Sequence, residues 1–262
     1  MILSQVRNEL DILHDRFNRK EFIERDPIVV PHRFSKHEDI EIAALFAAIF
    51  AWGQRVTIIN KCNELMALMD DAPHDFLMQH RPKDLKVFES FKHRTFNYSD
   101  VLYFIEFLST LYRAGYTLED AFVYEDIFNK KLKVKSEENI GINLNTFRAN
   151  FFSLEDYPSR TKKHISSPLQ KSTCKRLNMF LRWMVRSDDR GVDFGIWKQM
   201  KMHQLVCPID VHVEKVARNL NLIKSESLNW NTALELTQNL KLLDPKDPVK
   251  YDFALFGWGM DI

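Results

Sequence analysis

A lysine and an aspartate stand where two helices are expected to begin, and both residue types can take part in covalent chemistry. Lys175 follows Ser172 and Thr173, either of which can serve as an N-cap. The backbone N–H groups at a helix N-terminus carry partial positive charge, which favours the neutral, nucleophilic form of an amine. Lys175 is therefore a candidate nucleophile.

Asp210 precedes a helix expected over Val211–Leu220, after Pro208 has ended the preceding segment. A carboxylate at an N-cap accepts hydrogen bonds from backbone N–H groups, which hold it rigid and ionised. Such a group can stabilise a developing cation or orient an amine. Capping alone also explains an aspartate at this position, so a catalytic role for Asp210 depends on its company with Lys175.

Arg182 follows Lys175 by two helical turns and shares a helix face with Asn178 and Arg186. If the two side chains approach one another, Arg182 adds a second positive charge beside the candidate nucleophile. The alternative interpretation is that this face is exposed to solvent or contacts phosphate groups.

Basic residues gather in the segment 157–187, which contains no Asp or Glu. The whole chain of 262 residues is nearly balanced, with 37 basic and 36 acidic residues. A local cluster of this kind suits phosphate neutralisation, although an ordinary solvated surface is the alternative. Its members are Arg160, Lys162, Lys163, Lys171, Lys175, Arg176, Arg182 and Arg186.

The composition and the apolar spacing predict an all-α fold. Only 7 Gly and 9 Pro are present, too few for the many short strands of a sandwich or barrel. Apolar residues predict a buried helix over Glu38–Trp52 and a neighbour along Val56–Met69, joined by a tight turn at Gly53–Arg55. Thr117 and Asp120 form a possible capping box, and the segment 130–139 is expected to be an exposed loop.

Several classes of protein and site are excluded by what the sequence lacks. The chain is 45% hydrophobic, which supports a folded core, but it has no uninterrupted apolar run of membrane-spanning length. Its beginning is amphipathic rather than signal-like, so a cytoplasmic protein is expected. Three cysteines without C-x-x-C spacing, nine scattered histidines and the lack of a Gly-rich loop predict no disulfide, no metal and no cofactor.

Two segments resemble the helix-hairpin-helix (HhH-GPD) DNA glycosylase superfamily. Pro208–Val213 is similar to the P-x-D-x-H/R-V segment that carries the catalytic aspartate there, and Leu45–Thr57 is similar to an early helix with a Ser-Gln-x-Thr-type turn. Lys175–Arg182 looks like the lysine helix of the archaeal 8-oxoguanine glycosylase branch. The chain as a whole resembles an uncharacterised bacterial family related to that branch.

The resemblance implies a two-lobed fold with a cleft between the lobes. A central lobe, 38–187, would carry Lys175, and a second lobe, 1–37 with 188–262, would carry Asp210. The sequence departs from the pattern where Ser166–Cys174 replaces the glycine-rich hairpin and where Arg182 replaces a second lysine. An iron–sulfur cysteine quartet is also missing.

The activity implied is a DNA N-glycosylase with AP lyase chemistry, acting on 8-oxoguanine or a related damaged purine in duplex DNA through a Schiff base on Lys175, with Asp210 assisting. The protein would be a monomer associated with the bacterial nucleoid. Residues expected at the substrate or DNA are Gln54, Arg55, Arg182, Lys171, Arg176, Trp52 and Trp183. The alternatives are a non-catalytic nucleic-acid-binding module and an N-glycosidase acting on another nucleic-acid substrate.

Overall fold

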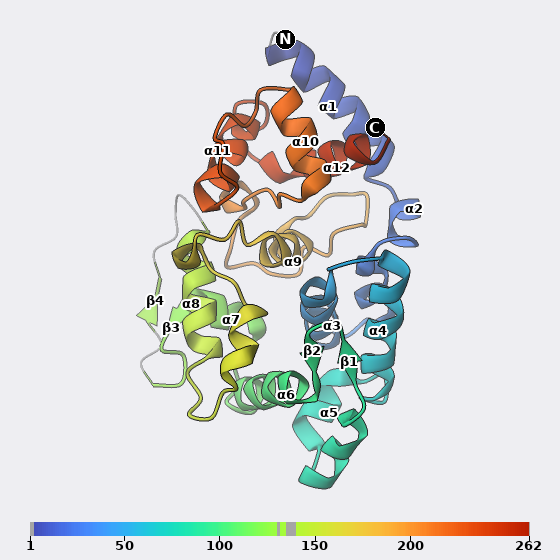
Figure 1. Ribbon diagram of the computed structural model, residues 1–262, viewed down its shortest axis with the longest axis vertical. Helices are drawn as coiled ribbons and strands as arrows, with labels where there is room; N and C mark the ends of the chain where they lie inside the picture. Colours follow the sequence, from blue (N-terminus) through green and yellow to red (C-terminus); the bar gives the residue numbers. More distant parts are fainter. Residues whose placement is uncertain (1–2, 130–131, 135–139, 262) are drawn as a thin grey trace. The chain divides into compact units, whose positions relative to one another are not determined.

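Helices make up most of the computed structural model, which describes residues 3–129, 132–134 and 140–261 (Figure 1). The predicted all-α class is confirmed. The strands in the described part are four two-residue pieces that pair as two antiparallel hairpins: β1 (Lys92–His93) with β2 (Phe96–Asn97), and β3 (Tyr124–Glu125) with β4 (Leu132–Lys133). The predicted loop over 130–139 lies mostly outside the described residues.

The chain contains twelve described α-helices, and long irregular segments with 3₁₀ turns precede and follow α9. They are α1 (Leu3–Phe17), α2 (Lys20–Ile23), α3 (His37–Phe50), α4 (Arg55–Ala67), α5 (Pro73–Gln79), α6 (Tyr98–Arg113), α7 (Leu118–Val123), α8 (Gly141–Phe151), α9 (Lys175–Val185), α10 (Val211–Asn219), α11 (Trp230–Lys241) and α12 (Tyr251–Asp261). Single 3₁₀ turns that matter below are η5 (Pro168–Gln170) and η7 (Pro248–Lys250).

Two compact units divide the chain. The first unit combines Met1–Glu24, Ser136–Gly141 and Ser167–Ile262, and the second combines Arg25–Lys135 with Ile142–Ser166. This division differs from the predicted lobes, 38–187 and 1–37 with 188–262, because α9 belongs with the two ends of the chain. Lys175 and Asp210 therefore lie in the same unit and not in two.

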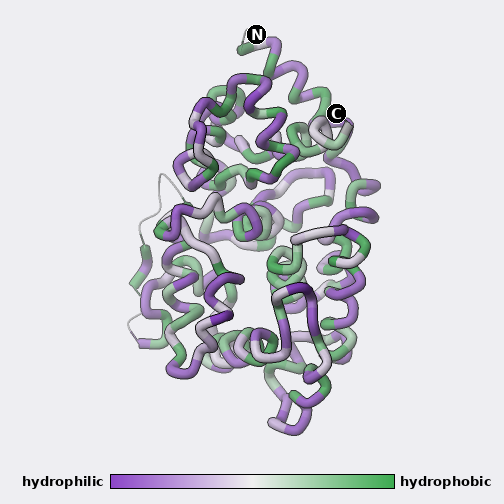
Figure 2. Tube along the Cα trace, viewed as in Figure 1, coloured by the Kyte–Doolittle hydropathy of each residue, from purple (hydrophilic) through white to green (hydrophobic). Residues whose placement is uncertain are grey.

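The second unit is built around α3. Every residue of α3 from Asp39 to Phe50 is buried, as the apolar spacing predicts, and its path is largely hydrophobic (Figure 2). Phe46 and Phe50 at its end pack against rings from the neighbouring elements: Phe46 in a tilted contact with Phe104 of α6 and Phe50 edge-on with Phe96 of β2. Gly53, with a φ of 116°, turns the chain from α3 into α4. Residues that have a Cβ atom rarely adopt this backbone angle, so glycine is favoured here.

The first unit has α12 at its centre, with α1 and α10 packed against it. Two glycines allow the close approach: a Cβ on Gly257 would meet the Phe17 ring, and one on Gly259 would lie 2.7 Å from the backbone oxygen of His212. The ring nitrogen Nδ1 of His212 is 3.0 Å from the Gly259 oxygen, which links α10 to α12. Among the described residues, no helix is both long and apolar enough to pass through a membrane.

Replacing Gly259 with alanine tests this packing. Helix propensity alone favours alanine by about 1 kcal/mol, whereas a methyl group against the backbone of α10 forces the two helices apart. We expect Gly259→Ala to lower the free energy of unfolding by about 1 to 3 kcal/mol in urea denaturation. An unchanged or higher stability would show that α10 and α12 do not approach as closely as described.

Candidate functional site

The segment before α9 presents an open helix N-terminus. Lys171 and Cys174 both have left-handed backbone conformations, with φ of 58° and 54°. Neither Ser172 nor Thr173 caps the helix as predicted, since Cys174 occupies the N-cap and forms no side-chain cap hydrogen bond. The Ser172 hydroxyl instead accepts from the Cys174 N–H at 3.0 Å. The first turn of α9 therefore keeps backbone N–H groups that no cap side chain satisfies.

Lys175 is the first residue of α9 and its side chain is exposed. Within the described parts of the chain, its ammonium makes no hydrogen bond or ion pair. The amine is therefore accessible to a ligand from solvent. Lys171, also exposed, and Arg176, half-buried, flank it in the sequence.

Asp210 caps α10, as predicted from its position. Its Oδ1 accepts hydrogen bonds from the backbone N–H groups of His212 at 2.9 Å and Val213 at 2.8 Å. Its Oδ2 accepts none from the residues that the structure describes. Two N–H donors thus hold one oxygen of a half-buried carboxylate, and the other oxygen remains available.

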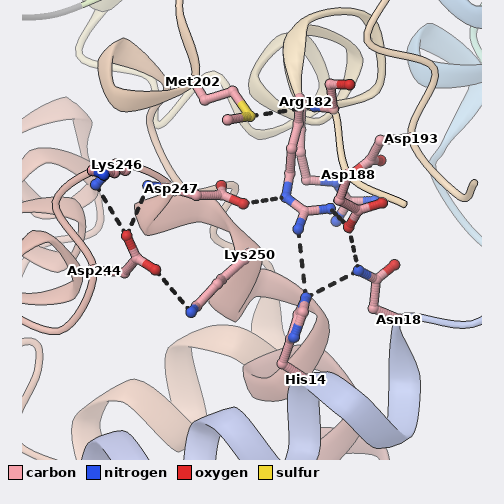
Figure 3. A network of polar contacts seen from close by, with 12 residues as sticks. His14, Asn18, Arg182, Asp188, Asp193, Met202, Asp244, Lys246, Asp247 and Lys250 are labelled. Atoms are coloured by element: carbon pink, nitrogen blue, oxygen red, sulfur yellow. Dashed lines mark hydrogen bonds and ion pairs between the residues drawn. The ribbon is translucent and has the colours of Figure 1, made fainter. Parts of the chain in front are cut away.

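Arg182 is buried and engaged in ion pairs (Figure 3). Its Nε lies 3.2 Å from Asp193 Oδ1, its Nη1 donates to Asp252 Oδ2, and its guanidinium stacks 4.2 Å from the Phe253 ring centre. Burial raises the pKa of Asp252 to about 7; the Arg182 charge opposes this shift and the Asp210 charge adds to it. Asp210, Arg182 and Asp252 are therefore electrostatically coupled.

Arg186, the C-cap residue of α9, forms a second set of ion pairs, and its partners Asp188, Asp193 and Asp247 are labelled in Figure 3. Its guanidinium lies 2.7 Å from Asp188, 3.0 Å from Asp193 and 2.9 Å from Asp247. His14 of α1 lies beside it, and burial together with the Arg186 charge lowers the pKa of His14 to about 4. Neutral His14 can then accept hydrogen bonds from Arg186 and Asn18.

The structure places the predicted binding residues in different environments. Arg182 is 4% exposed and Trp183 is 0% exposed, so neither reaches a nucleic acid from this position. Arg182 and Arg186 of the expected polar face are buried because the carboxylates of Asp193, Asp247 and Asp252 pair with them. Sequence periodicity contains no signal for these partners, which come from separate segments.

The remaining predicted residues lie in the second unit. Trp52 and Gln54 are exposed and Arg55 is half-buried, all at the junction of α3 and α4. The Trp52 ring stacks with Arg94 at 4.8 Å. The basic segment is also divided, since Arg160, Lys162 and Lys163 belong to the second unit and Lys171, Lys175 and Arg176 to the first.

Among the described residues, no group of three or more His, Cys, Asp or Glu side chains is arranged to hold a metal ion. The three cysteines, Cys62, Cys174 and Cys207, are all buried. Burial raises the pKa of the Cys62 and Cys207 thiols, which makes them poor nucleophiles. Lys175, which is exposed, is therefore a better candidate nucleophile than these thiols.

Comparison with known proteins defines the family. A family model described as a protein of unknown function (DUF2400) matches residues 26–261, and the chain belongs to this family. No curated protein and no solved structure matches it. The expected membership of the helix-hairpin-helix DNA glycosylase superfamily is wrong, because the matching model is that of DUF2400. Roles implied by that resemblance do not transfer, so Lys175 and Asp210 must be argued from their own geometry.

The raised pKa of Asp252 predicts how the free energy of unfolding depends on pH. Its folded-state pKa of about 7 lies above the ordinary value of 3.8. The contribution of Asp252 to the free energy of unfolding is therefore largest below about pH 4 and is lost as the pH rises to about 7, because the carboxyl group ionises in the unfolded state first. Asparagine cannot ionise. From pH 5 to pH 7 the unfolding free energy of the wild type should therefore fall by about 2 kcal/mol relative to Asp252→Asn, measured by urea denaturation.

Asp189→Asn is the matched control, since the Asp189 side chain is 96% exposed. Its stability should follow that of the wild type at each pH. Parallel wild-type and Asp252→Asn curves between pH 5 and pH 7 would contradict a raised pKa of Asp252.

Proposed function

We propose that this protein is a DNA N-glycosylase with an associated AP lyase activity, in which Lys175 is the nucleophile. One observation carries the proposal. The first unit holds both an exposed lysine with no carboxylate partner in the described chain, at the start of α9, and a carboxylate fixed at the start of α10. We propose a damaged purine, such as 8-oxoguanine, as the base removed.

The chemistry needs two groups. The neutral amine of Lys175 attacks C1′ of the damaged nucleotide, the glycosidic bond breaks, and the base leaves with the bonding electrons and takes up a proton. Loss of a proton from the bound amine and cleavage of the C1′–O4′ bond, whose oxygen takes up a proton, then give the Schiff base. Removal of a C2′ proton by water permits β-elimination of the 3′ phosphate. Asp210 Oδ2 would accept a proton from the attacking amine and offset positive charge at the sugar, while the α10 N–H groups hold Oδ1.

The same end of α9 supports a DNA partner. The N–H groups at a helix N-terminus bind phosphate oxygens, no cap side chain covers those of α9, and Lys171 and Arg176 add positive charge beside them. No acidic residue lies between positions 157 and 187 to oppose this. We propose that the segment Ser167–Arg176 contacts the DNA backbone next to the reacting nucleotide, whose base is turned out of the stack.

A non-catalytic nucleic-acid-binding module is the second candidate. The burial of Arg182 and Trp183 favours it, because both residues were expected near the substrate and neither is accessible. In that case Lys175 would only contact phosphate. The two candidates differ in whether a covalent bond to DNA forms.

Trapping with borohydride tests the nucleophile. Wild-type protein is incubated with duplexes containing 8-oxoguanine, uracil or an abasic site, and a reduced covalent adduct is sought by electrophoresis. We expect an adduct with wild type and none with Lys175→Gln, because an amide cannot form a Schiff base. Single-stranded versions of each oligonucleotide test whether the duplex is required.

Lys224→Gln is the control, since Lys224 is an exposed lysine of the same unit outside the proposed site. Its adduct yield should equal that of the wild type. Equal adduct with Lys175→Gln would exclude Lys175 as the nucleophile. Duplex binding without adduct or base release for every lesion would favour the binding module.

Asp210 is tested by a substitution that preserves the cap. Asparagine is as good an N-cap as aspartate, so Asp210→Asn should keep α10 and the melting temperature while it removes the charge. We expect the rate of base release to fall by about 100-fold, the order found when one stabilising group is removed. An unchanged rate with the same substrate would limit Asp210 to a structural role.

A further inference from the structure

A groove lies in the first unit where the chain leaves the C-terminal end of α9. Its volume is about 650 Å³, within the range of small-molecule sites. One wall is the end of α9 at Val185 and Ser187, another is the segment from Trp197 to His203, and Pro245 and Lys246 close it. All of these residues belong to the same compact unit.

The charged side chains that line this groove are all basic: Lys198, Lys201, His203 and Lys246. All four side chains are exposed, and no acidic residue lines the groove. In the part of the chain that the structure describes, no ion pair involves Lys201 or Lys246. The Lys201 ammonium donates to the Lys198 carbonyl at 2.7 Å, and an ammonium keeps two further donors after one such bond.

The two carboxylates nearest to Lys246 in the sequence bind other cations, and the contact of Asp244 with Lys246 is to its backbone N–H, at 3.0 Å (Figure 3). Asp244 binds the Lys250 ammonium at 2.8 Å, and Asp247 binds Arg186 at 2.9 Å (Figure 3). Neither neutralises the Lys246 side chain. The groove therefore presents positive charge that the protein itself does not balance.

The floor of the groove is apolar. Trp197 and Met200 are nearly buried there, and Met202 is held by the Ser187 N–H, which lies 3.3 Å from its sulfur (Figure 3). Backbone bonds also satisfy the last carbonyls of α9, since Phe194 N–H donates to Trp183 O and Trp197 N–H to Met184 O. The helix end thus adds little negative charge from those two groups.

We propose that this groove binds a free nucleoside phosphate, with the base or sugar against the half-buried Met202 of the apolar lining and the phosphate on Lys201 and Lys246. The concave shape, the unbalanced positive charge and the apolar floor each match one part of such a ligand. A thioether floor accepts a flat ring because it is polarisable and adaptable. The site is separate from Lys175, which begins α9, whereas the groove adjoins the end of that helix.

Titration calorimetry with AMP, adenosine and inorganic phosphate tests the site. We expect AMP to bind with one-to-one stoichiometry and at least about tenfold more tightly than either fragment. The double variant Lys201→Gln/Lys246→Gln should lower AMP affinity by at least about tenfold, as each lost charged contact weakens binding. Lys215→Gln, an exposed lysine on α10, is the matched control and should bind AMP like the wild type.

Three results would overturn the proposal. No binding of AMP by wild-type protein at about 1 mM would exclude a useful site. Equal affinities for AMP and inorganic phosphate would show that the nucleoside part is not recognised. Equal AMP affinities of the double variant and the wild type would show that AMP does not bind in this groove. A dT oligonucleotide that competes through the same lysines and binds more tightly than AMP would make the groove a strand-binding surface instead.

Discussion

The ion pairs of Arg182 and Arg186 connect α9 with the segment that follows it, with η7 and with α12, and the first unit depends on them. Both guanidinium groups are buried, as is Asp193, which they share. Loss of one partner would leave a buried charge uncompensated, which costs about 3 to 5 kcal/mol. The network therefore fixes where α9 lies relative to the C-terminal helices, and with it the position of Lys175.

Asp210 is positioned by α10 and by the packing of α10 against α12, not by the arginine ion pairs. Its carboxylate is held by α10, and α10 is held against α12 by the close approach at Gly259. The charges of Arg182 and Asp210 both shift the pKa of Asp252 of α12, Arg182 downward and Asp210 upward. The buried carboxylate is thus an electrostatic link between α9 and α10, and its protonation near pH 7 changes the charge beside the proposed site.

The two ends of α9 differ in what they offer to a ligand. The N-terminal end has no side-chain cap and carries the exposed Lys171 and Lys175, which suit phosphates and a reacting sugar. The C-terminal end has its Trp183 and Met184 carbonyls satisfied by the returning chain, and the groove beside it has an apolar floor and a basic rim. One helix, anchored by its buried arginines, thereby supports two separate proposed sites.

Local patterns in the sequence determined much of this protein: the all-α class, the buried α3, the break at Gly53, the capping box at Thr117 and the Asp210 cap. Each depends on residues within a few positions of one another. The burial of Arg182 and Trp183, the division that joins α9 to both chain ends, and the basic groove needed the tertiary structure. Their partners come from distant segments, and charge or periodicity along one helix carries no information about which carboxylates will cover it.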